Sequence, residues 1–239
     1  MRTRHLERSL RALALLGTTT TLLATGFIAS AWGQSAPVTL RRESGNLVLE
    51  GIPQRDAALT ERIGRYLNGR SAKFLDWLPD GSMLVSTRFG EVDQVHRLTA
   101  PKGNREQLTF FPEPVTVARA PTPATADGFV FLKDRGGDEN SQLYYYRPAD
   151  RSVRLLTDGK SLNGSPVWSN DGKRVAFHGN ARDGVSYDIY VADVESSTPA
   201  RLAVGGQQDM WFPVDWSADD TKLLLLRYVS INEGYLFIA

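Results

Sequence analysis

The sequence predicts an all-β protein, a β-propeller of four-stranded blades, and two sets of repeated residues carry that prediction. Acidic turns recur between apolar runs at intervals of 47, 44 and 48 residues, as Asp80-Gly81, Asp127-Gly128, Asp171-Gly172 and Asp219-Asp220. A second marker recurs at 48 and 46 residues, as Gln107-Leu108-Thr109, Leu155-Leu156-Thr157 and Arg201-Leu202-Ala203. Two independent markers with one period of this size indicate a solenoid, array or propeller.

Tryptophan stands three residues before three of the four turns, as Trp77, Trp168 and Trp216, while Ala124 takes that place in the second repeat. Because these indoles recur at a constant distance before the turns, we predict that they pack between blades rather than stack on a ligand. Asp-Gly between such runs favours a tight hairpin in which both central residues take positive φ.

Each repeat is expected to hold four strands, because its apolar residues alternate over short runs without helical spacing. In the third repeat these strands cover 165–168, 174–177, 187–192 and 200–202. The corresponding runs elsewhere are 83–86 with 94–98, 129–132 with 143–146, and 223–226 with 235–238. Three full repeats and part of a fourth predict an incomplete ring, the front of a longer protein. The alternatives are a β-sandwich of unrelated hairpins and a closed four-bladed ring.

Residues 1–31 are predicted to be a signal peptide. Four arginines, Arg2, Arg4, Arg8 and Arg11, precede an uncharged run over 12–31 that ends in small residues suited to cleavage. An uncleaved amino-terminal anchor is the alternative. We therefore expect an exported protein, periplasmic or secreted, with no stable membrane insertion beyond the leader.

Composition excludes several classes of site and partner. Without residues 1–31 the 28 basic and 27 acidic residues become 24 and 26, so the net charge is −2 and no nucleic-acid partner is expected. The chain has no cysteine, which excludes disulfides and thiolate chemistry. His96 and His178 lie in strand patterns of different repeats, so we expect neither a metal site nor a cofactor.

The domain organisation follows from these segments: the leader, an amino-terminal segment over 32–70, and a partial β-propeller over 71–239. The middle segment contains a helical pattern that starts near Pro53, carries Leu59, Ile63, Tyr66 and Leu67 on one face, and ends at Asn68-Gly69. It is interpreted as a lid or brace on the first blade, or as a contact for another domain.

Two stretches resemble known families. Residues 165–177, with 188–193 after them, resemble the TolB-like propeller repeat, which many exported proteins share. Residues 134–144, running on to Leu156-Thr157-Asp158-Gly159, resemble the amino-terminal propeller of the prolyl oligopeptidase family of serine peptidases. Residues 71–90, 211–217 and 228–233 are similar to the same family, so that the resemblance covers roughly 53–239.

The second resemblance implies a propeller that gates and selects peptide substrates for an α/β-hydrolase domain. That chemistry needs a serine within Gly-x-Ser-x-Gly, and no serine of this chain has glycines at both positions, so no catalytic residue is assigned. The first resemblance implies the alternative, a periplasmic protein-binding module without catalysis. The oligomeric state stays open.

In dipeptidyl-type relatives acidic propeller residues hold the amino terminus of the substrate. The resemblance therefore makes Asp138 and Glu139, in the polar loop 136–140, the candidate substrate-binding residues. The alternative is that they cap a hairpin and pair with Arg135. The sequence also lacks the aromatic-flanked pair of glutamates that dipeptidyl peptidases use.

Overall fold

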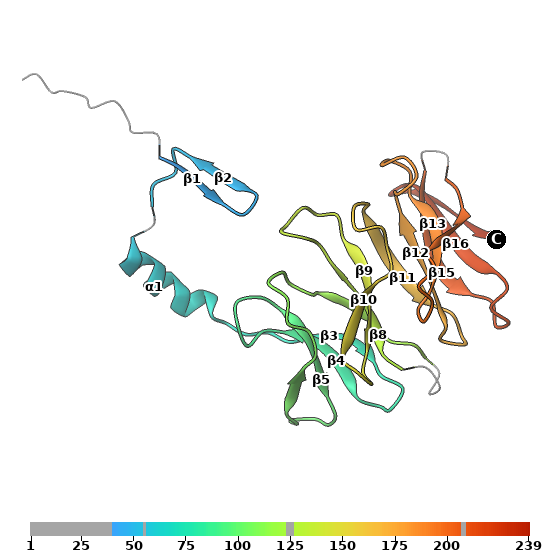
Figure 1. Ribbon diagram of the computed structural model, residues 1–239, viewed down its shortest axis with the longest axis horizontal. Coiled ribbons are helices and arrows are strands. Elements are labelled where there is room, and N and C mark those ends of the chain that lie inside the picture. The colour runs from blue at the N-terminus through green and yellow to red at the C-terminus, as the bar shows by residue number, and fades with distance from the viewer. Residues whose placement is uncertain (1–39, 55, 123–126, 207–208) are drawn as a thin grey trace, which may run out of the picture. The chain divides into compact units, whose positions relative to one another are not determined.

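The fold is described here from a computed structural model, for residues 40–54, 56–122, 127–206 and 209–239 (Figure 1). The predicted leader and Ala124 lie outside these residues. Within them the chain forms four antiparallel sheets in sequence order, preceded by a hairpin and a helix. No helix in this part of the chain has the length and apolar character needed to cross a membrane.

The sheets are meanders, in which strands adjacent in sequence are adjacent in the sheet. The first contains β3 (Lys73–Trp77), β4 (Met83–Thr87), β5 (Gln94–Leu98) and β6 (Arg105–Gln107). The second contains β7 (Val117–Arg119), β8 (Phe129–Lys133), β9 (Gln142–Arg147) and β10 (Ser152–Leu155). The third contains β11 (Asn163–Trp168), β12 (Arg174–Gly179), β13 (Asp188–Asp193) and β14 (Arg201–Val204). The fourth contains β15 (Met210–Trp216), β16 (Leu223–Ser230) and β17 (Glu233–Ile238).

This arrangement confirms the predicted fold class. Three sheets have four strands and one has three, as expected for three full repeats and part of a fourth. Every pair of neighbouring strands is antiparallel, which is the pairing that short loops between consecutive strands allow.

Apolar cores lie between consecutive sheets because alternate residues of a strand point to opposite faces. In β8, Phe129 and Phe131 join the core shared with the first sheet, while Val130 joins the core shared with the third. A further core joins the third and fourth sheets through Ile189 and Leu225. The two middle sheets are therefore buried on both faces.

The repeated acidic turns differ from the expected hairpin in one respect. Of the residues Asp80, Asp171 and Asp219, none has positive φ, and only the next residue does, at +80° for Gly81, +69° for Gly172 and +55° for Asp220. Each aspartate instead accepts a hydrogen bond from the backbone N–H two residues later, at 2.9 to 3.2 Å. The side chain thus holds a wider turn, so the expectation of two left-handed residues is wrong.

The helix α1 (Ala57–Leu67) begins later than the sequence suggested. Asp56 is its N-cap and accepts a hydrogen bond from the Ala58 N–H at 2.9 Å, so the expected start near Pro53 is wrong, whereas the end at Asn68 is as expected. No side chain of α1 is buried, and α1 contacts the first sheet through the Leu67 carbonyl oxygen, which accepts a hydrogen bond from the Arg88 side chain. The hairpin of β1 (Arg41–Ser44) and β2 (Leu47–Glu50) was not predicted.

Candidate functional site

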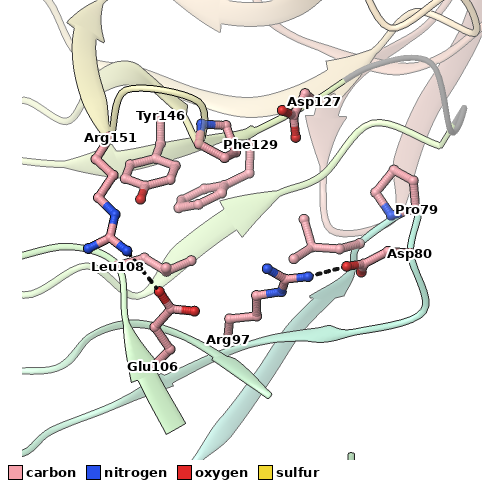
Figure 2. Close-up of a pocket in the computed structure, with 11 residues that line it drawn as sticks. Pro79, Asp80, Arg97, Glu106, Leu108, Asp127, Phe129, Tyr146 and Arg151 are labelled. Atoms are coloured by element: carbon pink, nitrogen blue, oxygen red, sulfur yellow. Dashed lines mark hydrogen bonds and ion pairs between the residues drawn. The ribbon is translucent and has the colours of Figure 1, made fainter. Parts of the chain in front are cut away.

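The candidate site is a groove of about 540 Å³ between the first and second sheets, called the first groove here (Figure 2). Its lining comes from both sheets and is mostly charged or aromatic: Leu78, Pro79, Asp80, Arg97, Glu106, Leu108, Asp127, Phe129, Tyr146, Pro148 and Arg151. The sheets are joined beneath it by the first apolar core, so the lining residues stand on a packed base.

One charged pair in the first groove belongs to the turn after β3. Asp80 accepts hydrogen bonds from the backbone N–H of Ser82 at 2.9 Å and from its hydroxyl at 2.5 Å, and it forms an ion pair with Arg97. The Ser82 hydroxyl, followed by the Ser82 amide and Arg97, holds the pKa of Asp80 below its usual range. The carboxylate is thus kept ionised beside a cation on β5.

A second charged pair bridges the two sheets across the first groove. Arg151 Nη2 lies 3.4 Å from Glu106 Oε1, and both side chains are largely exposed, at 77% and 52%. Figure 2 shows this pair and the pair of Asp80 with Arg97 as separate contacts in the groove. Exposed pairs of this kind contribute little to stability, so both can exchange partners with a ligand at small cost.

The wall between the charges is aromatic. The rings of Phe129 and Tyr146 are stacked with their centroids 4.8 Å apart, and both side chains are buried. Burial raises the pKa of the Tyr146 phenol, which therefore stays protonated at neutral pH. The first groove thus combines an apolar wall with carboxylates and guanidinium groups at its rim, a combination suited to binding a polypeptide segment.

The two residues predicted from sequence, Asp138 and Glu139, lie elsewhere, in the loop between β8 and β9. Asp138 accepts hydrogen bonds from the backbone N–H of Arg135 at 3.3 Å and of Asn140 at 3.0 Å, so it caps the loop. Glu139 is exposed and has a φ of +60°. The structure does not bring either residue to the first groove, and their role in substrate binding stays a prediction.

The base of that loop is a shielded ion pair. Lys133 Nζ lies 3.0 Å from Glu113 Oε2, with side chains 9% and 17% exposed, and Glu113 also accepts a hydrogen bond from the Gly136 N–H at 3.1 Å. The Lys133 ammonium is the main reason that the pKa of Glu113 is lowered. Sequence analysis missed this pair because its members come from a linker and a strand, 20 residues apart.

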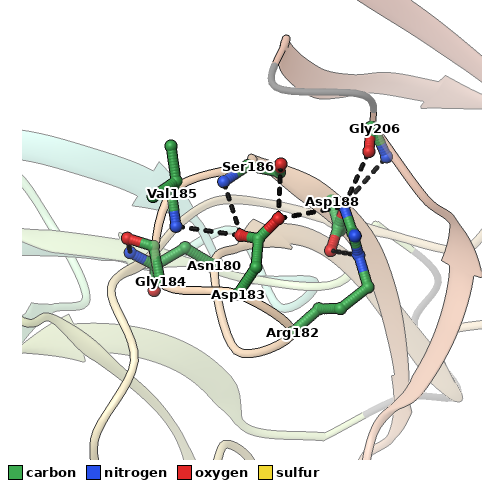
Figure 3. Close-up of polar contacts among 8 residues, drawn as sticks. All are labelled: Asn180, Arg182, Asp183, Gly184, Val185, Ser186, Asp188 and Gly206. Atoms are coloured by element: carbon green, nitrogen blue, oxygen red, sulfur yellow. Dashed lines mark hydrogen bonds and ion pairs between the residues drawn. The ribbon is translucent and has the colours of Figure 1, made fainter.

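The corresponding loop of the third sheet, between β12 and β13, is also held by internal polar contacts (Figure 3). Arg182 forms two hydrogen bonds with the fully buried carboxylate of Asp188, at 2.8 and 3.0 Å. Asp183 accepts from the Val185 and Ser186 amides and from the Ser186 hydroxyl, and this hydroxyl is the main reason that its pKa falls to about 2. These polar groups already have partners, so we regard the loop as structural.

The histidines do not form a site. His96 is fully buried with Nδ1 2.9 Å from the Gln94 carbonyl oxygen, and His178 is stacked on Tyr187 at 4.8 Å. Burial lowers the pKa of His178 to about 4. Within the described ranges no cluster of three or more histidine, cysteine, aspartate or glutamate side chains is arranged to hold a metal ion.

Comparison with known proteins adds evidence on the fold. No family model and no curated protein sequence matches the chain. TolB from Acinetobacter baumannii is similar in structure, with a TM-score of 0.50 and 22% identity over 71% of this chain and 40% of that one. A putative TolB from Agrobacterium tumefaciens is also similar in structure, with a TM-score of 0.51 and 20% identity over 68% of this chain and 58% of that one. This chain thus spans 40% and 58% of the length of these two structures. The described part of the chain has a TolB-like β-propeller fold.

Proposed function

We propose that this chain is an exported protein-binding module that uses the first groove to hold a segment of a partner protein and catalyses no reaction itself. The observation that carries the proposal is the pairing of Glu106 with Arg151 across two sheets beside the stacked rings of Phe129 and Tyr146. The rings themselves are buried, and Leu78, Leu108 and Pro148 supply the accessible apolar area beside charges of both signs. Apolar area with charges at its rim is the usual composition of a protein interface.

Four further observations support an exported module that binds without catalysis. The sequence contains no Gly-x-Ser-x-Gly element. The polar loop around Asp183 uses its hydrogen-bonding groups internally. The likeness to TolB structures concerns the propeller, and the predicted leader over 1–31 supports export of the module.

Photo-crosslinking in cells that produce the protein tests the proposal. A photoreactive amino acid at Pro148, which is exposed and lines the first groove, should crosslink to a partner, while the same group at the exposed control position Asn232 should not. Arg97→Glu should abolish the crosslink from position 148, since it reverses a charge of the groove. Equal crosslinking from both positions, or a product unaffected by Arg97→Glu, would contradict the proposal.

A second candidate function is the substrate-selecting propeller of a prolyl oligopeptidase family peptidase, with peptide substrates reaching a hydrolase domain. The sequence stretch 134–144 is the observation that favours it, and in this function Asp138 and Glu139 hold the amino terminus of the peptide. The product of the complete gene should then react with a fluorophosphonate, and Asp138→Asn should raise KM for peptides with a free amino terminus but not for acetylated ones. Failure of the labelling would remove this candidate and leave the binding module.

A further inference from the structure

A second groove, of about 460 Å³, lies between the outer strand β10 of the second sheet and the third sheet. Its walls are largely apolar and include Leu156, Phe177, Tyr190 and Pro199. Arg154 lines the same groove and is the only cationic residue among its lining. The second groove therefore presents one guanidinium group beside an apolar surface.

The guanidinium group of Arg154 lacks partners for most of its donors. Its Nη1 donates to the Ser196 carbonyl oxygen at 2.7 Å. Its Nε and Nη2 are buried and have no hydrogen-bond partner among the described residues. Charged donors that are shielded from water and unpaired raise the free energy of the folded state, and a ligand that pairs with them recovers that cost.

The repeat supplies an internal comparison. Glu106 pairs in register with Arg97 on β5, and Arg154 pairs in register with Tyr145 on β9, so the two residues hold equivalent positions 48 residues apart. Glu106 meets its counter-ion Arg151 from the next sheet. At Arg154 the corresponding loop, between β13 and β14, supplies only a backbone carbonyl.

Carboxylates near the second groove are already engaged. Asp158, which also lines it, accepts hydrogen bonds from the Lys160 and Ser161 amides and from the Ser161 hydroxyl, at 2.8 to 2.9 Å. Glu195 binds Arg147 and accepts from the Tyr145 hydroxyl at 3.2 Å. Neither forms an ion pair with Arg154 within the described part of the chain. The polar groups of the groove that still lack a partner are therefore the two donors of Arg154.

We propose that the second groove binds an extended peptide segment of a partner protein in which an acidic side chain adjoins a large apolar one. The apolar side chain lies against Tyr190 and Pro199, and the carboxylate forms a bidentate ion pair with Arg154 after a rotation of its flexible stem. A planar guanidinium matches a carboxylate in this way, which a lysine ammonium does not. This site is separate from the first groove and does not depend on the function proposed for it.

Fluorescence polarisation with the full 239-residue chain tests the proposal. The probe is the fluorescein-labelled, carboxyl-amidated peptide Gly-Gly-Leu-Glu-Phe-Gly-Gly, compared with the same peptide carrying glutamine in place of glutamate. The glutamate peptide should bind about tenfold or more tightly than the glutamine peptide, because a hydrogen-bonded charged pair is lost. Equal affinities, or no binding of either peptide, would overturn the proposal.

Variants locate the site. Arg154→Gln should abolish the preference for glutamate, and Arg154→Lys should retain only part of it. Leu155→Glu places a carboxylate on an exposed residue of the groove and should weaken binding of the glutamate peptide without affecting the core. The matched control Arg62→Gln, at an exposed arginine of α1 that lines neither groove, should leave the affinity unchanged. If Arg154→Gln unfolds at the wild-type temperature and still prefers the glutamate peptide, Arg154 is not the binding residue and the proposal is wrong. If Arg154→Gln does not fold, the effect of Leu155→Glu on the affinity and the comparison of the glutamate and glutamine peptides test the proposal instead.

Discussion

The indole Nε1–H of Trp168 donates a hydrogen bond to the backbone carbonyl oxygen of Arg119, at 2.8 Å, and so links the third sheet to the second. Trp216 makes the same contact with Val167, at 3.2 Å, between the fourth sheet and the third. In both pairs the acceptor lies 49 residues before the donor, one residue more than the 48 residues that separate Trp168 from Trp216. The recurrence of Trp168 and Trp216 thus has a physical cause, because each ring fills space between two sheets and its N–H donates to a carbonyl of the preceding sheet, whereas Trp77 is exposed.

Trp168→Phe should lower the free energy of unfolding by about 2 kcal/mol, because the Arg119 carbonyl loses its donor and the smaller ring leaves a gap. Trp77→Phe is the matched control, since Trp77 occupies the equivalent place in the first sheet but is 57% exposed, and it should cost about 0.5 kcal/mol or less. Urea unfolding followed by circular dichroism measures both. Equal losses in the two variants would contradict the role given to the hydrogen bond.

Asp220→Asn should destabilise the contact between the turns of the third and fourth sheets. The Asp220 carboxylate accepts from the Asn170 N–H at 2.7 Å and from the Asp171 N–H at 2.8 Å, and an amide side chain can replace only one of these acceptors. The expected loss is about 1–3 kcal/mol, the cost of one charge-assisted hydrogen bond. Asp219→Asn is the control, because Asp219 bonds only within its own turn and should have the smaller effect in thermal unfolding. A larger loss for Asp219→Asn would refute this explanation.

Gly128→Ala and Gly81→Ala, at equivalent turns, distinguish the destabilisation by left-handed backbone strain from the destabilisation by a steric clash of the added methyl group. Both glycines have positive φ, +87° and +80°, so both variants carry the strain of a left-handed alanine, about 1–2 kcal/mol. A Cβ at Gly128 would also lie 2.2 Å from the Tyr146 carbonyl oxygen, whereas one at Gly81 would meet nothing within 4 Å. Gly128→Ala should therefore cost at least about 2 kcal/mol more in equilibrium unfolding, because the second sheet must shift. Similar losses would show that the sheet accommodates the methyl group.

Stability should fall between pH 6.5 and about 4 because His178 is buried uncharged. Its pKa is 6.5 in the unfolded chain and about 4 in the folded protein, so in this interval only the unfolded chain gains the proton. The contribution of the uncharged His178 to the free energy of unfolding is complete above pH 6.5 and lost below about pH 4, and it amounts to about 3 kcal/mol. Urea unfolding at a series of pH values measures it.

His178→Gln should flatten this dependence whatever it does to the absolute stability. Burial also lowers the pKa of His96, so a smaller dependence of the same sign should remain. The aspartates with a pKa of about 2, Asp183 and Asp219, lose their contributions only as the pH falls from 3.8 towards 2, below the histidine interval. An unchanged pH profile in His178→Gln would assign the effect to other groups.

Local signals account for what sequence analysis predicted well and where it failed. The strands around Trp168 were placed correctly because alternation of apolar residues and turn chemistry act over a few residues. The start of α1 was misplaced because Pro53 and Asp56 are both acceptable near a helix start, and the capping hydrogen bond to Ala58 decides between them. The polarity of the loop at Asp138 was evident, but its hydrogen bonds to backbone amides were not.

By itself the sequence determined the repeat, its strand order and the fold class, since a period that returns with the same turns and tryptophans can be satisfied only by stacking similar sheets. The tertiary structure alone decided the sites. Whether Glu106 meets a cation, and whether Arg154 is left without one, depends on which loop of the next sheet faces it across the groove. The two residues hold the same position in the repeat, and the physical reason for their different roles lies in neighbours that are distant in the chain and adjacent only in space.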